Sequence, residues 1–174
     1  MSPPERRVLY DGRIVNLGLE TTRLPDGREV ELEIIRHVGA ASVVPLHDDG
    51  TVTLVRQHRH AGGGMMLELP AGTLEPGEDP VVCAARELAE EVNLRAERYA
   101  LLTVLHTTPG FCDERIWTYL AQGLSHAPGE LDADEYIEVV RMPLAEAVAR
   151  IERGEITDAK TLSGLLLAAR ITQA

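Results

Sequence analysis

The segment at residues 71–94, AGTLEPGEDPVVCAARELAEEVNL, constrains the fold more tightly than any other part of the chain. Asp79 followed by Pro80 is typical of a helix N-terminus, because aspartate accepts hydrogen bonds from the first free N–H groups and proline suits the first helical position. We therefore predict a helix over Pro80–Val92, directly after a glycine turn. At about 100° per residue, four apolar positions share one stripe that we expect to be buried: Val81, Ala85, Leu88 and Val92.

The same helix carries three glutamates within five residues: Glu87, Glu90 and Glu91. Glu87 lies one turn before both of the others, so the three carboxylates should converge, although like charges at this spacing cost roughly a few tenths of a kcal/mol per pair. A solvated acidic face is the simplest interpretation of RELAEE in isolation. Its context favours a metal site, because oxygen ligands clustered without Cys or His suit Mg²⁺ or Mn²⁺, and because Glu78 can fold back toward Arg86.

Composition narrows the classes of function. The formal net charge is −11, from 17 basic and 28 acidic residues, so the overall field does not attract nucleic acid and we expect no nucleic-acid partner. An acidic protein that acts on an anionic substrate needs local cations. No apolar run approaches the roughly 20 residues that span a bilayer, and no apolar stretch follows the N-terminal MSPPERRVLY. We therefore expect a soluble, cytoplasmic protein that does not bind membranes.

Strand and helix signals alternate along the chain, which predicts an α/β fold with a mixed sheet flanked by helices. The turn signal PDG at 25–27 separates two extended pieces, as in a β-hairpin. The expected strands cover residues 6–12, 13–24, 28–37, 40–46, 51–57, 99–108, 115–124 and 135–142. Two further helices are expected over residues 143–154 and 158–171. We place a small N-terminal antiparallel β subdomain at residues 1–37 and the main domain at residues 38–174.

The spacing Gly-x5-Glu-x7-Arg-Glu-Leu-x-Glu-Glu-x-Asn-Leu resembles the Nudix box, the signature of hydrolases that cleave a nucleoside diphosphate linked to another moiety. Its members here are Gly72, Glu78, Arg86, Glu87, Leu88, Glu90, Glu91, Asn93 and Leu94. The family usually has glycine where this chain has Asn93. Asparagine is the next best residue for a left-handed turn, so we expect the turn to be kept. The resemblance implies a Nudix-type α/β/α sandwich for residues 38–174.

Features outside the box resemble the ADP-ribose pyrophosphatase subfamily: VRQHRHAGGGMMLELPAG before it, Pro109 sixteen residues past Asn93, and LDADEYIEVVRM followed by GEITDAKTLSGLLLA. The resemblance extends from about residue 36 to 170. It implies Mg²⁺-dependent hydrolysis of ADP-ribose, or of a related nucleoside diphosphate sugar, to AMP and ribose 5-phosphate. The strand-rich N-terminus fits the subfamily's dimer-forming subdomain, and residues 6–37 hold too little apolar material for a core of their own. We therefore predict a homodimer.

The resemblance also assigns roles around the box. The implied metal ligands are Glu87, Glu91, the backbone carbonyl of Ala71 and, directly or through water, Glu90. Mg²⁺ is the expected cation, and Mn²⁺ is an alternative. Glu90, Arg86 and Glu78 are placed at the catalytic centre, where Glu78 is better explained as a structural partner of Arg86 than as a catalyst.

The candidate substrate-binding residues are Arg59, Arg36, Arg56, Glu68, Pro109 and Gly110. A guanidinium group matches the geometry of a diphosphate, and Arg59 is the strongest of the three arginines. Arg36 is equally well explained as a surface cation on a strand, and Arg56 is a third possibility. Glu68 either approaches the site from its strand or is an ordinary surface residue.

The expected mechanism follows from charge. The diphosphate is a dianion at neutral pH, and a bound metal would neutralise it, orient it and acidify a water molecule. A carboxylate on a loop would then accept the proton. Glu135 in DADEYIE matches the family's loop glutamate and is our candidate base, with Asp132 and Asp134 as rivals. A merely acidic surface loop is the alternative interpretation.

Other activities stay open at this point. Within the enzyme class, the alternatives are a GDP-mannose or other sugar-nucleotide pyrophosphatase and a nucleoside triphosphate pyrophosphohydrolase. A different class is a sensor domain that binds ADP-ribose-like ligands without cleaving them. Such domains usually lose glutamates of the box, whereas this chain keeps all four: Glu78, Glu87, Glu90 and Glu91.

Overall fold

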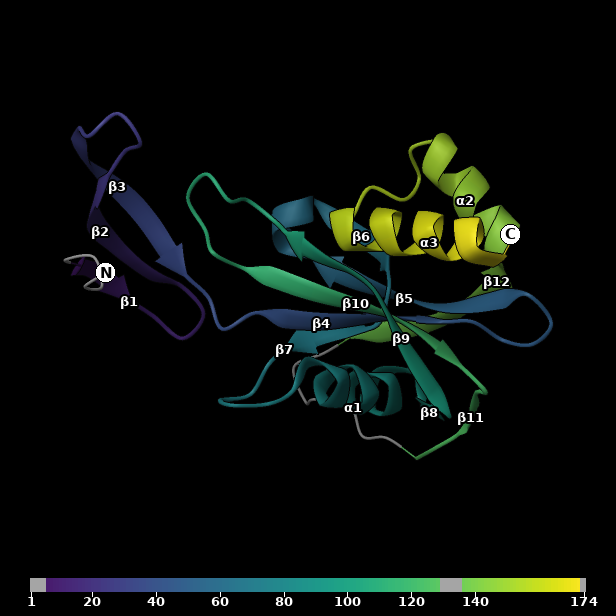
Figure 1. Cartoon of the computed structure of the whole chain (residues 1–174). Helices are drawn as coiled ribbons and strands as arrows, with labels where there is room; N and C mark the ends of the chain where they lie inside the picture. The colour runs from purple at the N-terminus through teal and green to yellow at the C-terminus, as the bar shows by residue number, and fades with distance from the viewer. Residues whose placement is uncertain (1–5, 129–135, 173–174) are drawn as a thin grey trace. The chain divides into compact units, whose positions relative to one another are not determined.

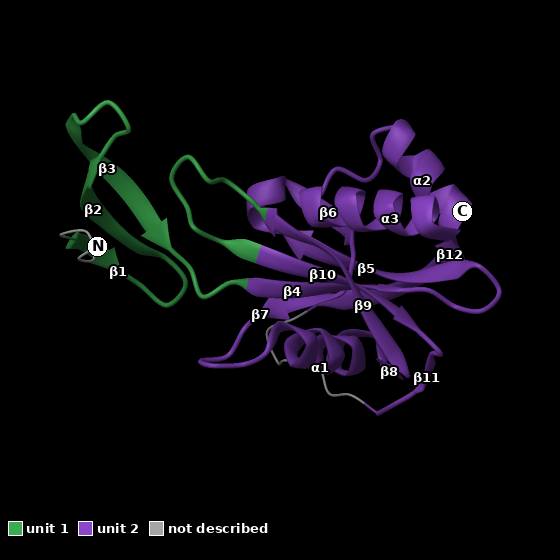
Figure 2. Ribbon diagram, in the orientation of Figure 1, with its two compact units in different colours: residues 1–39, 106–115 green, residues 40–105, 116–174 purple. Residues whose placement is uncertain are grey.

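The computed structural model describes residues 6–128 and 136–172. Its elements in chain order (Figure 1) are β1 (Arg6–Asp11), β2 (Asn16–Arg23), β3 (Glu29–Arg36), β4 (Ala40–Pro45), β5 (Thr51–Arg59), the 3₁₀ helix η1 (His60–Gly62), β6 (Gly64–Glu68), β7 (Ala71–Thr73), α1 (Pro80–Val92), β8 (Leu94–Arg95), β9 (Arg98–His106), β10 (Arg115–Gln122), β11 (Ser125–His126), β12 (Ile137–Pro143), α2 (Leu144–Glu152) and α3 (Ala159–Thr172). The chain forms two compact units, namely residues 1–39 with 106–115 (unit 1) and residues 40–105 with 116–174 (unit 2), as Figure 2 shows.

Unit 1 is built on an antiparallel sheet in which β2 lies between β1 and β3. The expected hairpin turn is present: Gly27 has a φ of 89°, and its N–H donates to the carbonyl of Leu24. Glu20 is buried on β2, where Arg6 of β1 and Arg36 of β3 both donate to its carboxylate. Because a buried charge needs such partners, this ion cluster ties the three strands together.

Unit 2 contains the expected mixed sheet. Strand β4 pairs in parallel with β10 and antiparallel with β7, in the order β7-β4-β10-β9. A second group, in the order β12-β5-β6, is antiparallel, and the short strands β8 and β11 pair with each other. A parallel pair needs a long crossover, so β4 and β10 meet only after the chain has passed through α1.

Helices cover both faces of these strands (Figure 1). Neighbouring residues of one strand point to opposite faces, and two hydrophobic clusters show which helices they meet. Val43 and Val55 pack with Leu88 of α1 in one cluster. Val44 and Leu54 pack with the apolar faces of α2 and α3 in the other. The predicted α/β/α sandwich is therefore confirmed.

The three predicted helices are all present, and α1 has the expected bounds. Within the described residues, no helix is long and apolar enough to cross a membrane. The sequence did not predict β6 and β7 as separate strands. Both strands precede α1, and β7 carries Ala71 and Gly72, which lie against the carboxylates of Glu91 and Glu87.

Candidate active site

Local signals fix both ends of α1. The side chain of Asp79 accepts a hydrogen bond from the N–H of Val81 at 3.0 Å, and Pro80 occupies the first helical position. At the other end, Asn93 adopts the left-handed conformation, with φ 55° and ψ 38°, and its N–H donates to the carbonyls of Leu88 and Ala89. The expectation that asparagine keeps the turn is confirmed.

The buried side of α1 differs from the predicted stripe. Leu88 and Val92 are buried as expected, but Val81 and Ala85 are only half-buried. The helix is instead rotated so that it buries Cys83, Ala84, Glu87, Leu88, Glu91 and Val92. The rotation places two carboxylates of the box on the inner side of the helix, which no count of apolar positions would favour.

Glu87 and Glu91 lie one helical turn apart and are only 8% and 2% exposed. Oε2 of Glu91 accepts a hydrogen bond from the N–H of Ala71 at 3.0 Å. The carboxylate of Glu87 lies directly over Gly72, where a Cβ atom would come within 1.8 Å of Oε1. A side chain at this position would therefore displace the carboxylate of Glu87.

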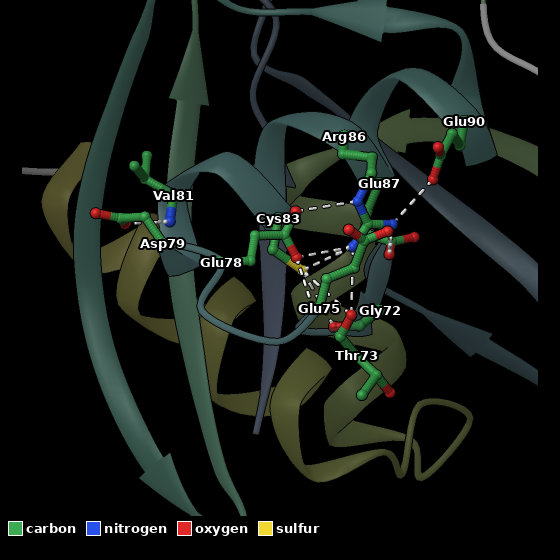
Figure 3. A network of polar contacts seen from close by, with 10 residues as sticks. All are labelled: Gly72, Thr73, Glu75, Glu78, Asp79, Val81, Cys83, Arg86, Glu87 and Glu90. Carbon is green, nitrogen blue, oxygen red and sulfur yellow. Dashed lines mark hydrogen bonds and ion pairs between the residues drawn. The ribbon is translucent and has the colours of Figure 1, made fainter. Parts of the chain in front are cut away.

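Arg86 connects the remaining carboxylates of the box (Figure 3). Its Nη1 donates to Glu87 Oε1 at 2.6 Å and to Glu90 Oε2 at 3.1 Å. Its Nε and Nη2 both donate to the carboxylate of Glu78 at 3.1 Å, so Glu78 and Arg86 form a two-point ion pair. The N–H of Glu75 holds the same carboxylate from the turn before the helix. The hydrogen bond from Arg86 is the main reason why the pKa of Glu78 is lowered.

The carboxylate oxygens of this site are donors of the kind that suits a hard cation. Among the described residues, no group of three or more His, Cys, Asp or Glu side chains is placed to hold a metal ion. Arg86 contacts Glu87 and Glu90 and supplies their countercharge. Glu87 and Glu91 nevertheless supply carboxylate oxygens at a buried place beside β7, and oxygen ligands of this kind are those that Mg²⁺ or Mn²⁺ prefers.

A second ion cluster lies at the ends of β5 and β6. Arg59 donates to Glu68 through Nε at 2.9 Å and through Nη2 at 3.0 Å. Glu68 is buried, and Lys160 of α3 also donates to its carboxylate. The hydrogen bond to Glu68 raises the pKa of Arg59, against the effect of burial, and the charge of Glu91 contributes in the same direction.

Lys160 is a residue that the sequence analysis missed. It lies 92 positions from Glu68 in the chain, so no local pattern links the two. A signal was nevertheless present, because Lys160 is the only lysine in a chain whose other 16 of 17 basic residues are arginine.

The other predicted substrate-binding residues lie in two different places. Arg56 pairs at 3.6 Å with Glu138, and by strand alternation it points to the opposite face of β5 from Arg59. Arg36, Pro109 and Gly110 belong to unit 1. Glu135, the candidate base, and its rivals Asp132 and Asp134 lie outside the described residues.

Within unit 1, Arg36 lies between two carboxylates. It donates to Glu20 through Nε at 2.8 Å and to Asp113 through Nη1 at 2.8 Å. The hydrogen bond to Arg36 is the main cause of a lowered pKa at Glu20, and the same bond raises the pKa of Arg36. Arg36 and Pro109 both line a cavity of about 480 Å³ in this unit.

Comparison with known proteins agrees with this geometry. The model of the NUDIX domain matches residues 36–165. An ADP-ribose pyrophosphatase of Bacillus subtilis is 38% identical over 155 residues, covering 88% of this chain and 84% of its own. An ADP-ribose pyrophosphatase of Mycobacterium tuberculosis is 40% identical over 168 residues, covering 94% of this chain and 81% of its own.

A solved structure described as an ADP compounds hydrolase has a TM-score of 0.83. It covers 99% of this chain and 96% of that one, at 23% identity, so it supports the fold alone. The domain match spans most of the chain and includes the whole helix–turn segment with its four glutamates. The chain therefore belongs to the Nudix family.

Proposed function

We propose that this protein is a metal-dependent hydrolase that cleaves the diphosphate of ADP-ribose, or of a closely related nucleoside diphosphate sugar, to AMP and ribose 5-phosphate. The observation that carries the proposal is the pair of buried carboxylates, Glu87 and Glu91, which α1 holds against Ala71 and Gly72 of β7. The names of the two bacterial pyrophosphatases support the substrate, because each matches most of this chain.

The ligands that we propose for Mg²⁺ are Glu87, Glu91, the backbone carbonyl of Ala71 and, directly or through water, Glu90. When bound, the cation supplies neutralisation of the diphosphate and a water of lowered pKa. Arg86 and Glu78 act on the glutamates themselves: Glu78 holds Arg86 at two points, and Arg86 holds Glu87 and Glu90. Loss of Glu78 would therefore change the positions of Glu87 and Glu90 through Arg86, although Glu78 contacts neither of them directly.

Arg59 is the residue that we propose for binding the diphosphate. Its guanidinium is fixed at two points by Glu68, and its side chain remains 43% exposed to solvent. In the proposed hydrolysis, water attacks one phosphorus of the diphosphate, and the bond from that phosphorus to the bridging oxygen breaks. A carboxylate of the protein accepts the proton of the water. We propose Glu135 for this last role, with Asp132 and Asp134 as the alternatives.

We also propose that unit 1 pairs with a second copy of the chain. Strand β1 exposes three large apolar side chains in a row, Val8, Leu9 and Tyr10, of which Tyr10 is 60% exposed. Exposed apolar strands of this kind are uncommon on monomers. A symmetric dimer would cover them.

A substrate screen tests the proposed activity. Purified protein is incubated with Mg²⁺ and, in parallel, with ADP-ribose, GDP-mannose and a nucleoside triphosphate, and the products are separated by chromatography. We expect AMP and ribose 5-phosphate from ADP-ribose at the highest rate. Faster cleavage of GDP-mannose would transfer the proposal to the sugar-nucleotide pyrophosphatases, and binding of ADP-ribose without turnover would indicate a sensor.

A further inference from the structure

The only lysine of the chain lies in the first turn of α3, where its side chain is largely shielded from solvent. The side chain of Lys160 is 11% exposed, whereas long cationic side chains are almost always solvated. Every other basic residue is arginine, so this position keeps an ammonium group in a chain that otherwise uses guanidinium groups. A buried charge of this kind requires partners that compensate for the lost solvation.

Those partners are two carboxylates. Nζ of Lys160 donates to Oε2 of Glu68 and lies 3.0 Å from Oδ2 of Asp158. Glu68 is 1% exposed and already receives Nε and Nη2 of Arg59. The carboxylate of Glu68 is already bound at two points by Arg59. A compact ammonium group reaches a remaining lone pair of such a carboxylate more easily than a second planar guanidinium does. Burial raises the pKa of Glu68, but the two cations outweigh this effect and keep its pKa low.

The first turn of α3 is tied to the same segment at a second point. Thr161 Oγ1 accepts a hydrogen bond from the N–H of Leu69 at 2.9 Å and donates to Asp158 at 2.6 Å. Two residues further along, the N–H of Ala71 donates to Glu91. The start of α3 is thus connected to the carboxylates of α1 through the short segment between β6 and β7.

Arg59 is the member of this cluster that faces outward. Its pairing with Glu68 uses Nε and Nη2, so that within the described part of the chain Nη1 makes no hydrogen bond to protein. The side chain of Arg59 is 43% exposed, whereas that of Glu68 is 2% exposed. The geometry therefore holds a partly exposed guanidinium at two points and leaves one donor nitrogen for a ligand.

We propose that Lys160 is a positioning residue for substrate binding: by holding Glu68 from behind, it fixes the guanidinium of Arg59 in the orientation that receives the diphosphate. This inference rests on the proposed function, because it requires an anionic diphosphate substrate. Lys160 contacts no substrate itself. Without Lys160, only Arg59 holds the carboxylate of Glu68, so the carboxylate can move and Arg59 can move with it. Arg59 then loses its fixed orientation but keeps its charge.

The test replaces Lys160 by methionine, which has a similar length and no charge. We expect KM for ADP-ribose to rise about tenfold, in line with the loss typical of an outer-shell partner, while kcat changes little because the lost interaction acts on ground state and transition state alike. Arg170→Met is the matched control, because it removes an exposed cation from the other end of the same helix. Its KM should equal that of the wild type.

A double-mutant cycle separates positioning from a merely structural role. In an Arg59→Ala background, Lys160→Met should raise KM no further, because the residue through which it acts is gone. Equal losses in both backgrounds would overturn the proposal, as would a Lys160→Met protein whose KM stays within about threefold of the wild type. If the wild type does not cleave ADP-ribose, the proposed function fails, and the cycle is repeated with GDP-mannose to test Lys160 independently.

A binding experiment on the unaltered protein covers the case in which Lys160→Met does not fold. Selective ¹³C-lysine labelling gives one lysine Cε resonance, because the chain has one lysine. We expect this resonance to shift when an ADP-ribose analogue with a methylene group in place of the bridging oxygen is added with Mg²⁺, and to shift much less in Arg59→Ala. A resonance that does not move at saturating analogue would contradict the proposal.

Discussion

Replacing Gly72 by alanine is the sharpest perturbation that the structure offers. The added Cβ would lie 1.8 Å from Oε1 and 2.1 Å from Cδ of Glu87. Non-bonded heavy atoms settle at about 3.5 Å from one another, so the carboxylate must withdraw by roughly 1.7 Å. The side chain of Glu87 has rotatable bonds and can move, whereas β7 is held by its pairing with β4. The substitution should therefore displace the carboxylate that we propose as a metal ligand and leave the fold in place.

A displacement of this size has a predictable effect on catalysis. A misplacement of about 1 Å can cost about 10²-fold in rate, so kcat/KM for ADP-ribose should fall at least about 10²-fold in Gly72→Ala. The measurement is steady-state kinetics with Mg²⁺ at 25 °C, together with thermal unfolding followed by circular dichroism. We expect the melting temperature to change little, because the displaced carboxylate can turn toward solvent.

Gly154→Ala provides the control for a glycine replacement that destabilises without touching the site. Gly154 follows α2 with a φ of 72°, and a Cβ there would meet no atom within 4 Å. Backbone strain at such a position costs about 1–2 kcal/mol, so this variant should melt earlier and keep full activity at 25 °C. The steric argument for Gly72 is refuted if Gly72→Ala retains kcat/KM within about threefold of the wild type.

Three further predictions concern the metal, the base and assembly. Glu87→Gln and Glu91→Gln should each lower turnover by about 10–100-fold or more while the fold persists. Excess chelator should abolish wild-type activity, and added Mg²⁺ should restore it. Activity that survives chelation would exclude the metal site. Glu135→Gln should lower kcat by about 10²–10⁴-fold with little change in KM, and losses below about threefold in this variant and in Asp132→Asn and Asp134→Asn would place the base elsewhere. Sedimentation at micromolar concentration should show a homodimer; an active monomer would contradict pairing through unit 1.

The sequence alone determined the local geometry of the box. Asp79 and Pro80 set the first turn of α1, and Asn93 set its end, because capping and the left-handed turn depend on residues that are adjacent in the chain. The spacing of the four glutamates identified the family, because this motif also consists of residues that are close together in the chain. The pairing of Glu78 with Arg86 was also foreseeable, since the turn between them is short.

Only the tertiary structure decided which side of α1 is buried and what surrounds it. The sheet beneath the helix accepts Glu87 and Glu91 because Gly72 leaves room and the N–H of Ala71 supplies a donor, so these carboxylates are more deeply buried than Val81 and Ala85. The periodicity of apolar residues could not predict the burial of these glutamates, because it contains no information about the strand that packs against the helix.

The same limit applies to contacts between distant segments. Lys160 meets Glu68 across 92 positions, and Arg36 meets Asp113 across 77. The latter contact joins the segment 106–115 to unit 1, whereas we expected residues 1–37 to form that subdomain without it. The Lys160–Glu68 pair is largely withdrawn from water, where an unpaired charge is costly, whereas the side chains of Arg36 and Asp113 are 44% and 38% exposed. Which charged residues from distant parts of the chain meet depends on the packing of whole strands and helices, so only the tertiary structure decides it.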